Sequence, residues 1–349
     1  MPDRDLLPDI LAALPLPALA INRNERIVAI NDAAKALVPS GAMGRHFVTV
    51  LRQPTLVEAV EKALREGTPG HASYLAGTVD KKVTYDVSLR PVAATGTLVL
   101  SFQDITHEAE AGQMRRDFVA NVSHELRTPL TALMGFIETL SGPAKDDPAA
   151  RERFLGIMSG EAERMNRLVG DLLSLSRVEA EERVRPTAKV DLVEVLRSTM
   201  RNLNPLAVDN DVELRPDLGP APLPLLGDAD QLLQVFTNLV ENAIKYGGKG
   251  KPVEIKAGTN LRDPALRGPA VRVTVADHGP GIDPVHLPRL TERFYRADSH
   301  RSRALGGTGL GLAIVKHILN RHRGRLRIAS EPGQGASFTV ILPLDLAAG

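Results

Sequence analysis

The sequence of 349 residues contains no cysteine and no tryptophan, and aromatic residues make up only 3% of it. The lack of cysteine excludes disulfide scaffolds, thiolate-ligated metal sites and cysteine catalysis. With so few aromatic side chains, we do not expect a base-stacking surface for single-stranded nucleic acid. Hydrophobic residues make up 43%, which is too many for a disordered chain, so Leu, Val, Ile and Ala must fill the cores.

An excess of one charge and a long apolar run are also missing. The formal net charge is +1, whereas a dedicated nucleic-acid binder carries a clear basic excess. The most apolar early stretch, Leu6–Ile21, contains Asp9 and three prolines and is shorter than the roughly 20 residues that cross a bilayer. It also lacks the basic leader and cleavage site of a signal peptide. The sequence as given predicts a cytoplasmic protein, and a membrane-anchored parent trimmed upstream of Met1 stays open.

The length predicts two or three domains, and the first is a small α+β domain over residues 1–105. Alternating or short apolar runs bounded by turns predict its strands. These runs are Ala18–Ile21, Ile27–Ile30, Val83–Pro91 and Thr97–Gln103. The spacing of apolar residues over Leu56–Arg65 predicts a helix between them.

Residues 106–182 carry two long apolar seams with a spacing of three and four. The first seam is Met114, Phe118, Val122, Leu126, Pro129, Leu133, Phe136 and Leu140, and the second is Phe154, Met158, Glu161, Met165, Leu168, Leu172 and Leu175. The loop SGPAKDDPA between them is rich in Gly, Pro and Asp, which predicts a helical hairpin. Two helices alone bury a two-sided core poorly, so we expect a dimeric four-helix bundle.

Residues 186–346 alternate helix and strand patterns. The expected helices are Asp228–Tyr246, with Asp228 as N-cap, and Leu310–Arg321. The expected strands are Val253–Ala257, Val271–Ala276 and a hairpin of Arg325–Ala329 with Ser337–Leu342.

The segment FVANVSHELRTPLTAL, residues 118–133, carries the first chemical motif. His124 falls off the apolar seam and should face solvent, and Thr128 shares its helix face. Glu125 can reach the ring edge, and Pro129 should kink or loosen the helix. A neutral imidazole is a competent nucleophile when a carboxylate takes its ring proton. The plain alternative is a surface histidine beside a glutamate.

The segment NLVENAIKYG, residues 238–247, places four polar residues on one helix face. These are Asn238, Glu241, Asn242 and Lys245. An amide oxygen suits Mg²⁺, which prefers substrate phosphates plus one or two protein oxygens. The plain alternative is the polar face of an exposed helix.

Two glycine-rich segments follow. In ADHGPGI, residues 276–282, Asp277 ends a strand before Gly279 and Gly281, a pattern that also occurs in ordinary turns. In GGTGLGLAIVKHI, residues 306–318, glycines precede a helix, where backbone N–H groups favour phosphate oxygens. A Rossmann turn is the alternative there, but no strand immediately precedes these glycines and no acidic ribose ligand follows at the expected place.

Upstream of the second glycine segment, ERFYRADSHRSR carries Arg293, Arg296, Arg301 and Arg303 against Asp298. Such a basic segment is suited to closing over a triphosphate. A solvated loop is the alternative.

The four motifs, in this order, resemble those of the two-component sensor histidine kinases. Residues 118–133 resemble the phosphoacceptor box, and residues 238–247 resemble the N box of the Bergerat ATP-binding fold. The segment ERFYRADSHRSRALGGTGLGLAIVKHIL most resembles the corresponding segment of the phosphate-regulon sensor kinases (PhoR type). The N-terminal stretch, which ends in SFQDITHEAE, is similar to PAS domains.

The resemblance implies a multidomain α+β chain in three parts. A PAS-like sensory domain would cover 1–105, a dimerisation and histidine phosphotransfer hairpin (HisKA) 106–182, and a Bergerat-type α/β sandwich that binds ATP (HATPase_c) 186–346. It also implies a homodimer, no direct nucleic-acid partner, and a PAS ligand that the sequence does not identify.

The resemblance further implies roles for single residues. His124 would accept the γ-phosphoryl group of ATP with Glu125 as base, and a receiver Asp of a response regulator, of the PhoB/OmpR type in the phosphate regulon, would then take it. Thr128 would orient water for a phosphatase reaction. Asn242 would hold Mg²⁺ and Asp277 would accept the adenine amine. The implied nucleotide contacts are Asn238, Asn242, Lys245, Tyr246, Asp277, Gly279, Gly281, Arg296, Gly307, Thr308, Gly309, Leu310 and Gly311.

Two other functions stay open at this point. An ATP-driven conformational machine of the gyrase or chaperone type needs a water-activating base where Asn238 stands, and asparagine is no base. A degenerate kinase that only binds partners would have no need of His124, Asn242 and Asp277 together.

Overall fold

The computed structural model describes residues 6–77, 82–220, 222–298 and 307–344. It divides into two compact units between Ala120 and Asn121. Helix α4, Thr106–Ser141, runs across this division. No helix within the described ranges combines the length and apolar character that crossing a membrane requires.

The N-terminal unit is built on one antiparallel sheet with the strand order β2-β1-β5-β4-β3. The strands are β1 Ala18–Ile21, β2 Ile27–Ile30, β3 Gly70–Gly77, β4 Lys82–Val92 and β5 Thr97–Asp104. The helices are α1 Leu6–Ala12, η1 Ala33–Ala36, α2 Phe47–Val50 and α3 Pro54–Glu66. The predicted strands and helix are present, and β3 was missed because Tyr74 is its one buried residue.

Asn31 fixes the chain around β1 and β2, although it is a buried polar residue. Its Oδ1 accepts the N–H groups of Ala18 and Ala34, both at 2.9 Å, and its Nδ2 donates to the carbonyl of Leu16 at 2.8 Å. These bonds satisfy backbone groups that the turns leave unpaired. Around them the core is purely apolar, with Leu19, Phe102 and their neighbours fully buried.

The second unit begins with the predicted helical hairpin, formed by the remainder of α4 and by α5, Pro148–Glu181. Asp147 caps α5 by accepting the N–H of Ala150 at 2.9 Å. Phe136 stacks on Phe154 with ring centroids 5.2 Å apart, which joins the two predicted seams. Helix α4 continues through Pro129, which is buried.

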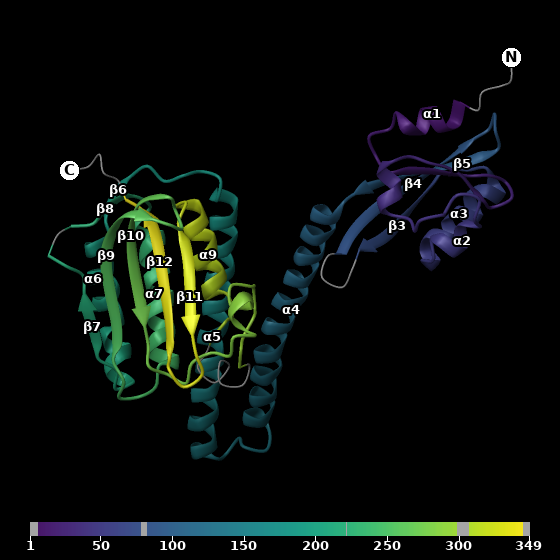
Figure 1. Ribbon diagram of the computed structural model, residues 1–349. Helices are drawn as coiled ribbons and strands as arrows, with labels where there is room; N and C mark the ends of the chain where they lie inside the picture. The colour runs from purple at the N-terminus through teal and green to yellow at the C-terminus, as the bar shows by residue number, and fades with distance from the viewer. Residues whose placement is uncertain (1–5, 78–81, 221, 299–306, 345–349) are drawn as a thin grey trace. The chain divides into compact units, whose positions relative to one another are not determined.

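A second sheet follows with the strand order β11-β12-β10-β9-β7, in which only β7 and β9 run parallel. The strands are β7 Leu214–Asp217, β9 Val253–Asp263, β10 Gly268–Ala276, β11 Arg325–Ser330 and β12 Ala336–Pro343. Helices α6 Leu192–Asp209, α7 Ala229–Tyr246 and α9 Gly311–Arg321 cover one face (Figure 1), and η2 Leu287–Arg289 and the small sheet of β6 Lys189–Asp191 and β8 Pro224–Leu226 complete it. We call this layered part the sandwich.

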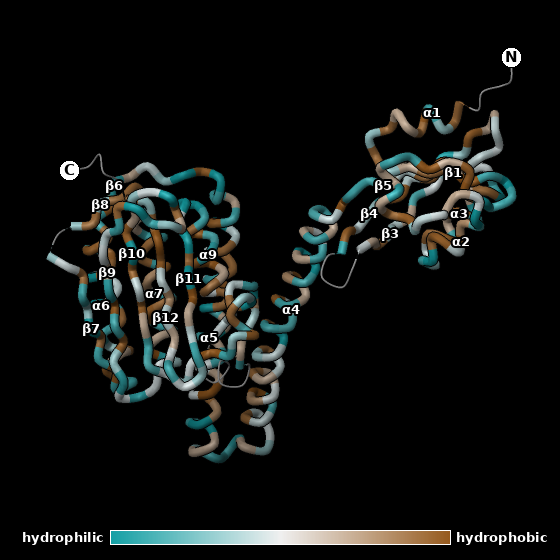
Figure 2. Tube along the Cα trace, in the orientation of Figure 1, coloured by the Kyte–Doolittle hydropathy of each residue, from teal (hydrophilic) through white to brown (hydrophobic). Residues whose placement is uncertain are grey.

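The sandwich core follows from helical and strand periodicity. In β10 Val271, Val273 and Val275 alternate inward and are fully buried, as expected for a strand with one covered face. Helix α7 buries a broad apolar face that includes Phe236 and Leu239. The apolar residues of α7, α9 and the central strands are visible as brown segments in Figure 2.

His322 ties the end of α9 to the start of α7 and is 1% exposed. Its Nε2 accepts the N–H of Asp228 at 3.0 Å, so Nδ1 carries the proton and donates to the carbonyl of Ile318 at 2.8 Å. Burial lowers the pKa of His322 because the charged ring loses its solvation. The neutral form is therefore part of the folded sandwich.

We expect His322 to lower the free energy of unfolding as the pH decreases below neutral. An unfolded His has a pKa of about 6.5, and the folded His322 takes up its proton at a lower pH. Between these two values the unfolded chain binds more protons, so the unfolding free energy decreases as the pH drops below about 6.5. In urea unfolding, His322→Gln should show a shallower loss of stability from pH 7 to 5.5. The exposed His107→Gln control should keep the wild-type slope, and an unchanged slope in His322→Gln would contradict the assignment.

Candidate functional site

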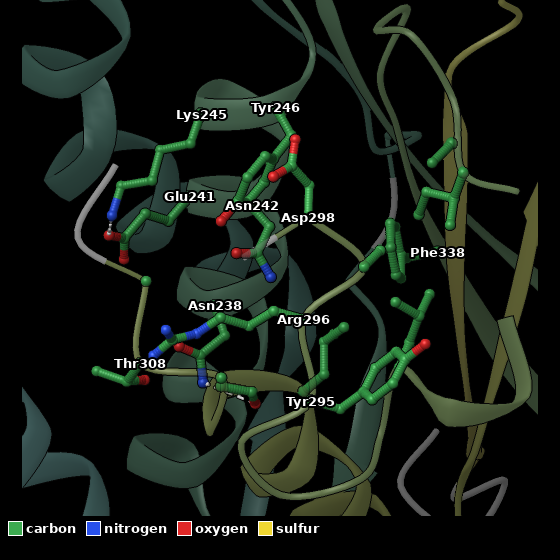
Figure 3. A pocket seen from close by; sticks show the side chains of 18 of the residues that line it. Asn238, Glu241, Asn242, Lys245, Tyr246, Tyr295, Arg296, Asp298, Thr308 and Phe338 are labelled. Atoms are coloured by element: carbon green, nitrogen blue, oxygen red, sulfur yellow. Dashed lines mark hydrogen bonds and ion pairs between the residues drawn. The ribbon is translucent and has the colours of Figure 1, made fainter. Parts of the chain in front are cut away.

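A cavity of about 790 Å³ opens between α7, the segment after β10, the glycine segment before α9, and α5. Figure 3 shows side chains of α7, of the glycine segment (Thr308) and of Tyr295, Arg296, Asp298 and Phe338 around it. Of the thirteen residues expected to contact nucleotide, eleven line the cavity. They are Asn238, Asn242, Lys245, Tyr246, Asp277, Gly281, Arg296, Gly307, Thr308, Gly309 and Gly311. The structure thus brings together residues that lie up to 73 positions apart in sequence.

Helix α7 supplies one wall of the cavity. Asn238, Glu241, Asn242 and Lys245 all line it, which confirms that they share one helix face. Lys245 Nζ donates to Glu241 Oε1 at 2.5 Å, and Asn238 Nδ2 donates to the carbonyl of Gly311 at 3.4 Å. Asn238 therefore connects α7 to the first turn of α9.

Asp277 lines the cavity and is 8% exposed. Its Oδ1 accepts the N–H of Gly279 at 2.8 Å and that of Ala336 at 3.3 Å. Gly279 does not line the cavity, and its part is to hold Asp277. Gly281 has φ +73° and a Cβ there would collide with the carbonyl of Glu331, so only glycine fits.

The glycine segment before α9 forms the opposite wall. Gly309 has φ +74°, and its carbonyl accepts the N–H of Phe294 at 2.8 Å. Leu310 was expected at the cavity, but its side chain is fully buried at the start of α9. Gly306, Arg301 and Arg303 lie outside the described residues.

The two described arginines of the basic segment point to different places. Arg296 lines the cavity, its side chain is 7% exposed, and its Nη2 donates to Glu125 Oε2 at 2.9 Å. Arg293 instead donates to Glu179 of α5 at 2.6 Å. Arg296 therefore reaches from the cavity to the helix that carries His124.

His124 is exposed on α4, as expected, and does not line the cavity. Thr128 is also exposed, and its Oγ1 donates to the carbonyl of His124 at 3.1 Å. Glu125 differs from the expectation that it reaches the ring of His124. Its Oε2 accepts from Arg164 Nη2 and Arg296 Nη2, both at 2.9 Å, because these guanidinium groups offer stronger, charge-assisted hydrogen bonds.

Sequence reasoning missed the contribution of α5 to the cavity wall. Arg167 and Asp171 line the cavity, and Thr308 Oγ1 donates to Asp171 Oδ2 at 2.6 Å. Burial raises the pKa of Asp171, and the hydrogen bond from Thr308 opposes this rise. The signal was available: Asp171 lies between Leu168 and Leu175 at spacings of three and four, a charge on an otherwise buried stripe.

The acidic end of α5 also docks on the sandwich. Glu182 accepts from His317 at 2.8 Å and from Asn320 at 2.9 Å, and Arg321 pairs with Glu181 at 3.2 Å. Burial opposes ionisation of Glu182, but its two hydrogen bonds hold its pKa below the ordinary value. Polar contacts thus continue the α5–sandwich interface beyond the cavity.

Two family profiles match the chain. The family described as His Kinase A (phospho-acceptor) domain matches residues 114–181. The family described as histidine kinase-, DNA gyrase B-, and HSP90-like ATPase matches residues 227–346. The first match contains His124 and the second contains α7, Asp277 and the glycine segment.

Whole-chain comparisons agree with the profiles. The chain is 35% identical over 358 residues to the sensor-like histidine kinase SenX3 of Mycobacterium tuberculosis, covering 97% of this chain and 80% of that protein. It is 43% identical over 237 residues to the phosphate regulon sensor protein PhoR of Pseudomonas aeruginosa. That alignment covers 68% of this chain and about half, 52%, of the relative.

The fold also has a counterpart among solved structures. A crystal structure of the histidine kinase ThkA in complex with the response regulator protein TrrA matches with a TM-score of 0.53 at 21% identity. The match covers 97% of this chain and 98% of that one. With two family profiles and relatives across nearly its full length, the chain belongs to the sensor histidine kinases of two-component systems.

Proposed function

We propose that this kinase transfers the γ-phosphoryl group of ATP to His124 and passes it to an aspartate of a response regulator. The observation that carries the proposal is the bond between Arg296 and Glu125. It joins a cavity lined by glycine backbone and an asparagine-rich helix edge to the residue next to an exposed histidine. A cavity for a polyphosphate and a nucleophilic imidazole are the two parts that phosphoryl transfer requires.

Nucleotide binding is proposed for the cavity on the chemistry of its lining. Buried Asp277 offers a carboxylate to the amine of adenine, and Gly281 lines the same cavity. At the other end, backbone around Gly309 and the first turn of α9 favours phosphate oxygens, because the N–H groups at a helix N-terminus are unpaired within the helix. Lys245 and Arg296 add positive charge.

A magnesium ion fits this donor set, and Asn242 is the residue proposed to hold it. Its amide oxygen is a hard ligand on the cavity wall, and Mg²⁺ usually combines one or two protein oxygens with waters and substrate phosphates. Among the described residues no group of three or more His, Asp or Glu side chains gathers for a metal. When bound with ATP, the ion would neutralise charge that develops on the phosphates.

His124 is proposed as the nucleophile and Glu125 as its base. The exposed ring can meet a phosphoryl group brought to it. Asn238 stands where hydrolysing members of the Bergerat fold have a base, and an asparagine cannot activate water. This favours transfer to a side chain over hydrolysis.

A homodimer is proposed because α4 keeps a second apolar strip that its own hairpin leaves uncovered. Leu130, Met134 and Ile137 recur at spacings of four and three and are 50%, 56% and 51% exposed. On α5, Leu173 is 67% exposed. Pairing two hairpins into a four-helix bundle would bury these side chains.

The partner is proposed to be a response regulator, and the phosphate regulon is the proposed context. Relatives at 43% and 35% identity are the phosphate regulon sensor PhoR and SenX3, and ThkA was solved with a response regulator. A regulator of the PhoB/OmpR type would fit that context. Thr128, on the face of His124, is proposed to orient water for phosphatase activity.

We propose that the chain is divided into three domains. We propose a PAS-like sensory domain at 1–105, supported by its five-stranded antiparallel sheet. A phosphotransfer hairpin would occupy 106–182, and an ATP-binding sandwich 186–346. The PAS-like domain would supply the input that sets kinase and phosphatase activity.

The function is tested by incubating the chain with radiolabelled ATP and Mg²⁺. We expect acid-labile, base-stable label on the wild type, and His124→Ala should lose it completely because the nucleophile is gone, while still binding nucleotide. The exposed His107→Ala is the matched control and should label normally. Free phosphate without protein label would indicate an ATPase. The absence of both products would indicate a scaffold that only binds partners. Acid-labile label on His124→Ala would show that another residue is phosphorylated and would contradict the assignment of His124.

Asp277→Asn should weaken ATP binding about tenfold or more, equal to roughly 1.4 kcal/mol. The amide keeps one oxygen for the N–H of Gly279 but presents an NH₂ donor where the adenine amine needs an acceptor. Calorimetric titration of Mg-ATP measures the change, and the exposed Asp217→Asn should match wild type. Wild-type affinity in Asp277→Asn, with the fold intact, would remove this residue from adenine recognition.

Thr128→Ala should keep autophosphorylation near wild type and slow dephosphorylation of the regulator by about tenfold or more, roughly 1.4 kcal/mol. The hydroxyl bonds only the carbonyl of His124 in its own helix, and alanine is a good helix former. Decay of purified phospho-regulator with kinase and ADP is the measurement. If wild type speeds this decay over the no-kinase control and Thr128→Ala does so equally, the water is oriented by another group.

A further inference from the structure

Two groups of the sandwich can donate hydrogen bonds to phosphate from the cavity wall, and both are held by the α4–α5 hairpin, here called the bundle. The Arg296 guanidinium donates to Glu125 of α4 at 2.9 Å. The Thr308 hydroxyl donates to Asp171 of α5 at 2.6 Å. Each acceptor is a carboxylate oxygen, which resembles a phosphate oxygen in charge and in the bonds it accepts.

The groups around the Arg296–Glu125 bond allow Arg296 to exchange this partner for another. The Arg296 side chain is only 7% exposed, and its Nε finds no acceptor among the described residues. Glu125 keeps a second cation, Arg164, whose side chain is 13% exposed. If Arg296 turned to a phosphate, Glu125 would still be paired with Arg164.

We propose that Glu125 and Asp171 stand in for phosphate oxygens, so that a nucleoside triphosphate and the docked bundle compete for Arg296 and Thr308. This inference rests on the proposed nucleotide site. Arrival of the triphosphate draws Arg296 and Thr308 away from the bundle, which loosens docking and releases one donor from Glu125 Oε2. The proposed base thus loses one of its two cationic partners when phosphate is present and keeps Arg164. By linkage, docking weakens nucleotide binding by the same factor.

The experiment measures binding of a non-hydrolysable ATP analogue with Mg²⁺ to the full chain. Asp171→Asn weakens the bond to Thr308 and should tighten analogue binding about fivefold or more, the lower end of usual coupling between sites. Thr308→Val should weaken binding, because the hydroxyl is lost to phosphate as well. A purely structural hydrogen bond would move both variants in the same direction.

A double variant separates competition from general electrostatics. If Asp171 acts through Thr308, the gain from Asp171→Asn should shrink or vanish in a Thr308→Val background. A gain that persists there undiminished would come from removal of negative charge alone and would overturn the proposal. Glu163→Gln, an exposed change on α5, is the matched control for charge and should bind like wild type.

A second variant guards against misfolding at Asp171. Glu125→Gln should also tighten analogue binding, since its neutral amide holds Arg296 more weakly. Equal or weaker binding in both Asp171→Asn and Glu125→Gln, with wild type binding the analogue, would overturn the competition and leave the proposed function standing. A wild-type chain that binds no nucleotide would overturn both.

Discussion

Helix α7 packs one face into the core of the sandwich and lines the cavity with the other. This double role determines where the site lies. Its broad face, with Phe236 and Leu239 fully buried, holds the sandwich together. The remaining edge carries Asn238 and Asn242, which cannot enter an apolar core without hydrogen-bond partners. These residues face the cavity, and the sheet and α9 pack on the same helix. Binding groups and core thus share one period of 3.6 residues.

Helix α5 repeats the arrangement in a different form. Its stripe toward the sandwich buries Leu168, Leu175 and Val178 almost completely, yet Arg164 and Asp171 interrupt it. Apolar burial supplies the stability of the interface, whereas the two charged residues lower it unless they are paired. Such residues make the interface conditional, because a competitor for their partners changes the free energy of docking. An all-apolar stripe would dock as firmly and respond to nothing in the cavity.

The sequence predicted those parts of the molecule that have a strong local signal. The strands of the first sheet around Ala18–Ile21, the α4–α5 hairpin and the polar edge of α7 follow from periodicity and caps, and the structure has them. It did not predict β3, because Tyr74 is the one buried residue of that strand. It also placed Glu125 at the ring of His124 by proximity along the helix, whereas the position of the carboxylate depends on Arg164 and Arg296. Pairing across 39 and 171 residues leaves no local pattern to read.

The arrangement at Glu125 carries a wider consequence for how such a kinase can be controlled. A base that is always free beside His124 would leave phosphorylation dependent on nucleotide supply alone. In the docked arrangement Glu125 is held by one arginine from its own hairpin and one from the cavity wall. Any movement of α4 relative to α5 changes the first contact, and any ligand of the cavity changes the second. Under the proposed competition, a signal that shifts the hairpin and a nucleotide that fills the site would therefore act on the same carboxylate of Glu125.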